Sequence, residues 1–275
     1  LEGARLKVMD KDGNVIDEWT SEKDKPYVIK RLVVGETYTL HEEFAPYGYL
    51  KATDVTFTVK DTAEVQKVEM KDEVPKGLLI INKKGEFLEK ITLLDNVKGT
   101  VEHFFEYITG NLSEVTFEVY AAEDIKAADG VSADHYKKDE LVGTITTDEK
   151  GIAKMEDLPV GKYYVKEVKT EHGFVLDGEP RFVDLTYRDQ DTPMVTFDEE
   201  WQNNRQKIKV TVLKKAKDTD RMLEGAIFGL FTKEDIKGRD GKVLMEAGTL
   251  IEQKTTDENG QILFKADLPV DGTYI

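Results

Sequence analysis

A glutamate occupies an inward-facing position in a predicted β-strand. The stretch GKYYVKEV, residues 161–168, is rich in β-branched and aromatic residues, which is typical of strands. Successive strand residues point to opposite faces, so Glu167 shares a face with Tyr163 and Val165. The pattern therefore predicts a carboxyl group directed into an apolar core.

Two other predicted strand ends each direct one polar side chain to the same core. In GLLIINKKG, Lys83 continues the face of Leu79 and Ile81. In TFDEEWQNN, Asn203 continues the face of Trp201. A lone buried charge is costly unless it finds a partner or becomes neutral, so we expect the lysine, the glutamate and the asparagine to meet.

Together these three side chains could form a covalent bond. An apolar setting lowers the pKa of Lys83 and yields a neutral amine, which is a nucleophile. The same setting favours a protonated Glu167, which can polarise an amide carbonyl and shuttle protons. The Asn203 side chain supplies the carbonyl under attack. The predicted product is a Lys–Asn isopeptide bond with release of ammonia, formed once without turnover, so the chain is not expected to be an enzyme.

Each residue also has an ordinary interpretation. A glutamate near a strand end is usually solvated. Lys83 could pack its stem and hold its amine in water, and Asn203 could begin a turn. Alternation along strands leaves both interpretations open.

Composition excludes several classes of function. The net charge of −16 argues against binding to nucleic acid or to an anionic membrane surface. The absence of cysteine excludes disulfides, thiol catalysis and cysteine-ligated zinc. The four histidines are scattered and suggest no metal site, and no cofactor is expected. No apolar run approaches the roughly 20 residues that span a bilayer.

The chain repeats itself with an offset of about 110 residues. TTDEKGIAKMEDLPVGKYYVKE begins at Thr146, and the similar TTDENGQILFKADLPVDGTYI begins at Thr255. A third, shorter copy opens the chain with LEGARLKVMD, which matches LEGAIFGLF at Leu223. We therefore predict domains at residues 1–75, 76–205 and 206–275. The first is expected to lack its first strand, the third to be truncated at its C-terminus, and the middle one to be complete.

The predicted fold is all-β. Short alternating segments are separated by turn signals at DG, NG and PVG, which is typical of tandem antiparallel β-sandwiches. Residues 85–111 form an insertion in the middle copy. Within it, residues 95–110 carry apolar side chains at helical spacing and predict a short inserted helix. Those side chains are Val97, Val101, Phe104, Phe105 and Ile108.

The motifs resemble the B-type (Cna-B) repeat of Gram-positive collagen adhesins and SpaA-like pilins. The resemblance covers nearly the whole chain and lies in LEGAIFGLF, TTDEKG, DLPVGKYYVKEV and HGFVL. The family's Tyr-x-Leu-x-Glu stretch and Pro-x-Gly-Tyr turn stand in the first copy as YTLHE, ending at Glu42, and PYGY, ending at Tyr49. In the middle copy the turn reads EHGF, so its proline and final tyrosine are replaced.

The resemblance implies a prealbumin-like, inverse-immunoglobulin sandwich that often forms a Lys–Asn or Lys–Asp bond with a glutamate as catalyst. Carried over to the middle copy, Lys83 is the amine, Glu167 the catalyst and Asn203 the acceptor.

In each flanking copy the resemblance assigns only part of the set of lysine, glutamate and acceptor. Glu42 matches the catalyst of the first copy and Asp72 its acceptor, while the corresponding lysine is expected before Leu1. Lys214 matches the amine of the third copy, whose glutamate and acceptor are expected beyond Ile275. Whether the flanking bonds form is therefore open.

The function implied by the resemblance is a stalk segment of an extracellular, cell-wall-anchored adhesin or pilin. Sortase and the cell wall would be engaged through regions outside this chain, and a host extracellular-matrix or surface ligand is a further implied partner. One alternative is a ligand-binding module in the insertion, which predicts an exposed aromatic patch around Phe104, Phe105 and Tyr107. The other is an accessory β-sandwich domain of a secreted enzyme.

Overall fold

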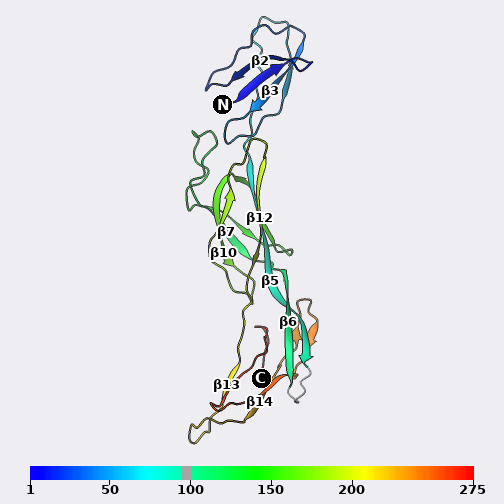
Figure 1. The fold of residues 1–275 in the computed structure, drawn as a ribbon, viewed down its shortest axis with the longest axis vertical. Coiled ribbons are helices and arrows are strands. Elements are labelled where there is room, and N and C mark those ends of the chain that lie inside the picture. The colour runs from blue at the N-terminus through cyan, green and yellow to red at the C-terminus, as the bar shows by residue number, and fades with distance from the viewer. Residues whose placement is uncertain (95–100) are drawn as a thin grey trace.

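The protein is an elongated, all-β molecule in which groups of strands follow one another along the long axis (Figure 1). The computed structural model describes residues 1–94 and 101–275. Within these ranges every regular element is a strand, so the predicted fold class is confirmed. No helix in the described part of the chain is long and apolar enough to cross a membrane.

The N-terminal strands form a sheet with the order β2-β1-β3-β4. A small apolar cluster around Val8, Tyr38 and Leu40 packs against this sheet. The strands are β1 (Arg5–Met9), β2 (Val15–Thr20), β3 (Thr37–Phe44) and β4 (Val55–Thr58).

The middle part is a sandwich of two sheets around the largest apolar core. One sheet has the order β11-β10-β7-β8, and in the other β5 pairs with both β12 and β9. Phe117, Tyr163 and Leu79 lie fully buried between the sheets. The strands are β5 (Lys76–Leu94), β7 (Thr116–Ala121), β8 (Leu141–Thr146), β9 (Ile152–Pro159), β10 (Gly161–Lys169), β11 (Arg181–Leu185) and β12 (Met194–Gln202).

The first and last strands of the middle sandwich run parallel to each other. Their register pairs Lys76 with Met194 at one end and Lys83 with Trp201 near the other. A parallel pair brings chain segments far apart in the sequence side by side. The entry of the chain into the sandwich and its exit therefore lie on neighbouring strands.

The insertion is a β-hairpin, and the predicted helix is wrong. Strand β5 continues far beyond the sandwich and pairs antiparallel with β6 (Glu102–Asn111). The apolar residues of 102–108 are β-branched or aromatic and alternate equally well in a strand, where Phe105 is buried and Phe104 exposed. Hydrogen bonding to β5 along this segment outweighs their helical spacing. Val97, which the helix also included, lies outside the described residues.

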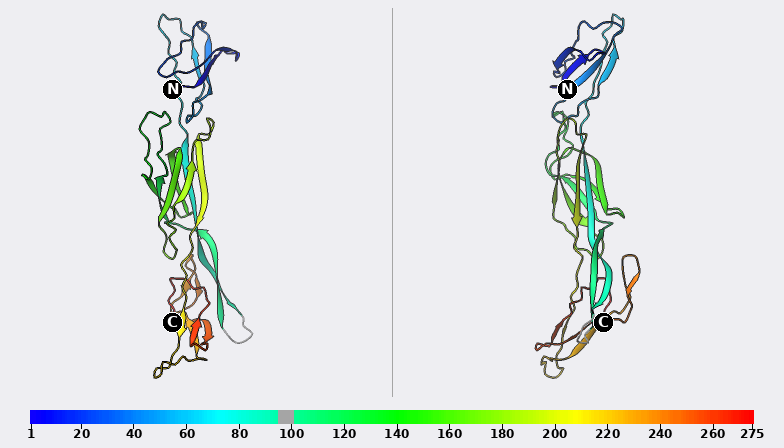
Figure 2. Two further views of the ribbon diagram at one scale, coloured as in Figure 1. Left: turned by 60° about the vertical axis from the view of Figure 1, so that its left-hand side comes forward. Right: turned by 45° about the vertical axis from the view of Figure 1, so that its right-hand side comes forward.

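The C-terminal strands pack against this hairpin. Strand β17 pairs with β6 through Glu252 and Glu102, so one sheet continues from the middle sandwich into the third copy (Figure 2). Leu88 and Phe105 of the hairpin are buried together with Ile251. The strands are β13 (Thr211–Leu213), β14 (Ile227–Phe231), β15 (Ile236–Lys237), β16 (Val243–Met245), β17 (Leu250–Thr255) and β18 (Gln261–Leu263).

Arg205 also contacts both parts of this junction. It directly follows the middle sandwich and is only 7% exposed. Its guanidinium carbon lies 3.7 Å from the ring centre of Tyr107, and its nitrogens form ion pairs with Glu86 and Asp267. The hairpin, the connecting segment and the third copy thus meet at one buried cation.

The sequence repeat has a counterpart in the backbone hydrogen bonds. The amide of Lys83 donates to the carbonyl of Gly151 at 2.7 Å, and the amide of Lys214 donates to the carbonyl of Gly260 at 2.8 Å. Both glycines have positive φ, +72° and +67°, and a Cβ on either would lie 2.6 Å or less from the lysine carbonyl oxygen. The turn glycine therefore sets the position of the lysine in each copy.

We predict that Gly151→Ala destabilises the middle sandwich more than Gly130→Ala does. Gly130 also has positive φ, +63°, but has open space around its Cβ position. Both changes introduce left-handed backbone strain of about 1–2 kcal/mol. Only Gly151→Ala also forces the backbone of Lys83 to move, which should cost about 1–2 kcal/mol more. Scanning calorimetry tests this difference, and equal shifts of the unfolding transition would contradict the assigned role of Gly151.

Candidate functional site

Lys83 is buried near the end of the sandwich part of β5. Leu79, Ile81 and Lys83 alternate inward and are 0%, 0% and 1% exposed. The Lys83 backbone pairs with Trp201 of β12 and donates to Gly151 just before β9, and its side chain extends into the core instead of reaching water.

Glu167 lies opposite on β10 and forms an ion pair with this lysine. The distance between Lys83 Nζ and Glu167 Oε2 is 2.8 Å, and both side chains are almost fully buried. Phe117 pairs with Glu167 across the sheet, and its ring centre lies 5.7 Å from Lys83 Nζ. The ion pair is therefore enclosed by apolar and aromatic groups.

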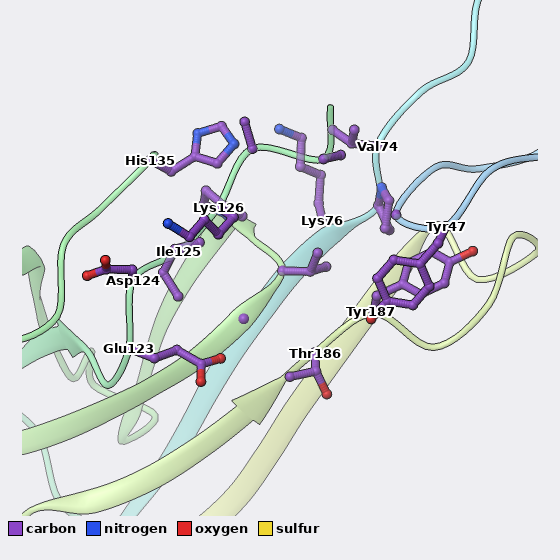
Figure 3. A pocket seen from close by; sticks show the side chains of 17 residues that line it. Tyr47, Val74, Lys76, Glu123, Asp124, Ile125, Lys126, His135, Thr186 and Tyr187 are labelled. Atoms are coloured by element: carbon purple, nitrogen blue, oxygen red, sulfur yellow. The ribbon is translucent and has the colours of Figure 1, made fainter. Parts of the chain in front are cut away.

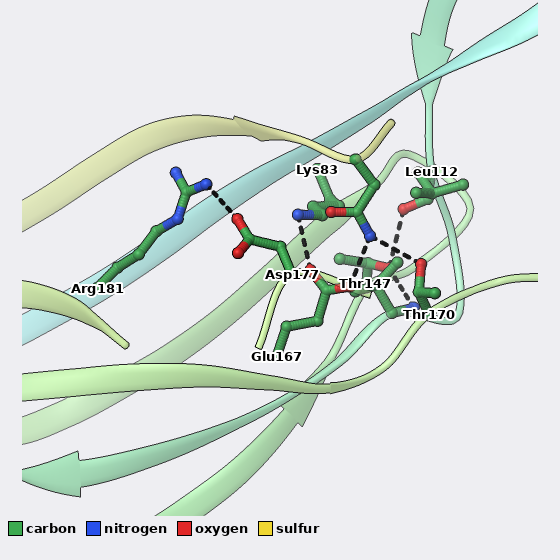
Figure 4. A network of polar contacts seen from close by, with 9 residues as sticks. Lys83, Leu112, Thr147, Glu167, Thr170, Asp177 and Arg181 are labelled. Carbon is green, nitrogen blue, oxygen red and sulfur yellow. Dashed lines mark hydrogen bonds and ion pairs between the residues drawn. The ribbon is translucent and has the colours of Figure 1, made fainter. Parts of the chain in front are cut away.

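Asn203 completes the group from the end of β12. Its Nδ2 donates to Glu167 Oε1 at 2.6 Å and to Thr170 Oγ1 at 2.8 Å, while its Oδ1 is buried without a hydrogen-bond partner (Figure 4). The structure thus brings the three residues together from three different strands, as their inward positions in the sequence predict.

Burial dominates the electrostatics of Lys83. It lowers the pKa of the amine, and the positive charge of Arg181 acts in the same direction, whereas Glu167 opposes the shift. Arg181 is held by an ion pair with Asp177 at 2.6 Å, and its guanidinium carbon lies 4.8 Å from the ring centre of Trp201. A lowered pKa makes the neutral, nucleophilic amine more accessible at neutral pH.

The geometry differs in one respect from the expected chemistry. Glu167 was expected to polarise the carbonyl oxygen of Asn203, but it contacts the amide nitrogen instead. One carboxylate oxygen faces the nucleophilic amine and the other faces the nitrogen that would leave. Such a bridging carboxylate can accept a proton from the amine and return one to the leaving group.

The corresponding residues of the first copy, Glu42 and Asp72, lie next to each other. Glu42 on β3 is fully buried, and its Oε2 accepts a hydrogen bond from the amide of Ala52 at 2.6 Å. Burial raises the pKa of Glu42, and nearby Asp72 raises it further; burial also raises the pKa of Asp72. Among the described residues no ion pair joins either carboxyl group to a lysine amine.

In the third copy, Lys214 has the backbone hydrogen bonds of Lys83 but not its surroundings. Its amide donates to Gly260 and its carbonyl accepts from Leu223. The residue is exposed, and within the described part of the chain it forms no ion pair. The structure does not bring it to a carboxyl group.

Thr170 and Arg181 are the site residues that the sequence did not reveal. Thr170 stands three positions after Glu167, where simple alternation would place it on the opposite face. Arg181 lies beyond a loop on another strand. Only the register of the sheets relates either residue to Lys83.

Other parts of the described structure offer weaker candidates for a ligand-binding or metal site. A pocket at the junction of the first and middle copies contains Ile125, Tyr47 and Tyr187, the two tyrosine rings 4.8 Å apart (Figure 3). Three charged residues that line it, Glu123, Asp124 and Lys126, are exposed. No cluster of three or more potential metal ligands occurs among the described residues.

The aromatic residues of the hairpin mostly face the third copy. Phe105 is 4% exposed, and the hydroxyl of Tyr107 donates to the carbonyl of Asp267 at 2.8 Å. Phe104, 54% exposed, is the ring of the three that faces solvent. The packed rings support a connecting role for the hairpin and weigh against the exposed patch that a ligand-binding insertion predicts.

Comparisons with known proteins agree with this architecture. The family model SpaA, described as a prealbumin-like fold domain, matches residues 1–74 and 107–201, more than half of the chain. No curated protein matches the chain.

Solved structures are similar at low identity. The Bacillus anthracis TIE protein is 24% identical and superposes with a TM-score of 0.60, covering 100% of this chain and 42% of its own. GBS52, the minor pilin of Streptococcus agalactiae, is 14% identical with a TM-score of 0.29, covering 74% of this chain and 84% of that one. The major pilin SpaD of Corynebacterium diphtheriae is 18% identical with a TM-score of 0.29, covering 59% and 41%. This chain therefore spans about two fifths of the length of the TIE protein, whose fold it shares.

We predict that the unfolding free energy of the Asn203→Ala variant rises with pH in the range just below 10.5, the ordinary pKa of lysine. This variant keeps the Lys83–Glu167 pair but lacks the acceptor. The pKa of Lys83 is lower in the folded protein than its ordinary value of 10.5, so the unfolded chain binds more protons in this window. Raising the pH then favours the folded state, by at most about 1.4 kcal/mol per pH unit for one group.

The control is the same variant with Lys83→Met, and urea unfolding at several pH values measures both. The pH dependence should be weaker in the control. Above about pH 10 the trend reverses, because burial raises the pKa of Tyr107 to about 12 and the unfolded chain then loses its tyrosine protons first. Identical pH dependence in the two proteins would show that Lys83 is not perturbed.

Proposed function

The chain belongs to the SpaA family of prealbumin-like fold domains, and we propose that it is a structural stalk segment of an extracellular surface protein whose middle sandwich is locked by a Lys83–Asn203 isopeptide bond. The observation that carries the proposal is the shared, buried carboxylate. Glu167 holds Lys83 Nζ on one oxygen and Asn203 Nδ2 on the other, at 2.8 and 2.6 Å.

The proposed reaction is a single condensation. Lys83 transfers a proton to Glu167, and its neutral Nζ attacks Cγ of Asn203. The Nζ–Cγ bond forms, the Cγ–Nδ2 bond breaks, and Nδ2 leaves as ammonia with a hydrogen that originates from the lysine amine. Glu167 relays this hydrogen and ends the reaction protonated. The bond persists, so there is no turnover.

Strand direction explains why such a bond would suit a stalk. Strands β5 and β12 are parallel neighbours, and Lys83 and Asn203 lie at the end where the chain leaves the sandwich. A pull on the two ends of the chain would pass along β5, across the new bond and out after Asn203. Residues 84–202 would bear no load, and closing a loop of this length also removes about 5 kcal/mol of unfolded-state entropy by analogy with a disulfide.

A chain without cysteine cannot form a disulfide, and the proposed bond would provide a covalent cross-link of another kind. Attachment to the cell wall by sortase, through regions outside this chain, belongs to the proposal through family membership. A host-matrix ligand and an accessory role in a secreted enzyme remain alternatives that no particular contact favours.

The intact mass of the purified protein tests the bond directly. We expect wild type to be lighter than its sequence by about 17 Da, the mass of one ammonia, because one lysine amine condenses with one amide. Glu167→Ala should restore the full mass.

The matched control is Glu156→Ala, which removes an exposed glutamate of β9 and should retain the mass loss. A full-length mass for wild type would refute the cross-link.

Single-molecule pulling tests the mechanical role. In wild type the middle sandwich should not release residues 84–202, whereas Glu167→Ala should lengthen by an additional step of about 400 Å when this segment extends. The step length is read from force–extension curves. The proposal fails if cross-linked wild type and the variant extend by the same length.

A further inference from the structure

Thr170 is the second hydrogen-bond acceptor for the nitrogen that would leave during the condensation. We propose that Thr170 positions the Asn203 amide for this reaction, an inference that rests on the proposed isopeptide bond. The hydroxyl holds Nδ2 beside Glu167, so the amide nitrogen stays next to its proton donor.

The two contacts define the orientation of the amide. Nδ2 has two hydrogens, and their acceptors are Glu167 Oε1 at 2.6 Å and Thr170 Oγ1 at 2.8 Å. Oδ1 is buried and has no hydrogen-bond partner. The terminal torsion of an asparagine is broad and nearly two-fold, so its own rotamer preference does not decide between nitrogen and oxygen at this place. The carboxylate accepts only, so it selects the nitrogen, and the hydroxyl of Thr170 then accepts the second hydrogen and fixes the amide in this orientation.

A β-bulge brings Thr170 to the site. In strand β10, Glu167 pairs with Phe117 but Lys169 pairs with Thr116, so the register shifts between them. One extra residue, Val168, lies in this interval and is 43% exposed. In a regular strand, residues three apart point to opposite faces, whereas the bulge allows Glu167 and Thr170 to face the same amide. Bulges often redirect a side chain next to a reactive site.

The side chain of Thr170 contributes little else to the fold. It follows the last residue of β10 and is partly buried. The side-chain hydrogen bond that the structure records for it leads to Asn203. Replacing the hydroxyl by a methyl group should therefore disturb the sandwich much less than it disturbs the orientation of the amide.

The test is the rate of ammonia loss in newly made protein. Wild type, Thr170→Val and Thr170→Ser are produced by cell-free translation, translation is stopped, and samples are denatured at intervals for intact-mass measurement. We expect Thr170→Val to lose about 17 Da roughly tenfold more slowly than wild type, a factor that corresponds to about 1.4 kcal/mol of activation free energy. Thr170→Ser retains the hydroxyl and should react at a rate close to wild type.

The outcomes are distinct. A slow valine variant with a fast serine variant supports the proposal. Equal rates for wild type and Thr170→Val would overturn it, because the hydroxyl would then be dispensable. A serine variant as slow as the valine variant would also overturn it, because retaining the hydroxyl would then not preserve the rate. If wild type itself never loses mass, the proposed cross-link fails first. Melting temperatures of the three proteins in the unreactive Lys83→Arg background should agree, and a large drop for valine alone would assign Thr170 a structural role instead.

Discussion

The buried ion pair between Lys83 and Glu167 is the constraint on which the middle sandwich depends. Two opposite charges in an apolar core are stable only when each satisfies the other, and removing one partner leaves a costly lone charge. The pair fixes the distance between the two sheets at the end where the chain leaves, and it places a nucleophilic amine against an amide. The same desolvation that makes the pair costly lowers the pKa of Lys83 and makes its chemistry accessible.

Strand β5 connects this site to the rest of the molecule. Its first half forms the parallel edge with β12, and its second half forms the hairpin that packs against the third copy. Arg205, two residues after Asn203, contacts this hairpin and Asp267 of the third copy. The proposed bond would therefore lie where both segments that continue toward the third copy leave the sandwich, and tension would pass from one rigid junction into the other.

The middle and third copies share a backbone framework at the lysine, and the copies differ in chemistry. The turn glycine and the lysine amide make the same hydrogen bond in the middle and third copies, yet Lys83 is buried and Lys214 is exposed. Glu42 keeps the buried position of Glu167 but faces Asp72. The repeated fold thus supplies positions for a lysine, a glutamate and an acceptor. Within the described residues, all three are present in the middle copy.

The sequence by itself determined the all-β class, the repeat and the inward direction of Lys83, Glu167 and Asn203, because strand alternation and turn residues are local properties. It also determined that no disulfide could brace the chain. Only the tertiary structure decided that residues 102–111 form a strand, since pairing with β5 overrides their helical spacing. It alone decided that Thr170 faces Asn203, because a bulge is a property of the register between strands, and register depends on partners that are distant in the sequence.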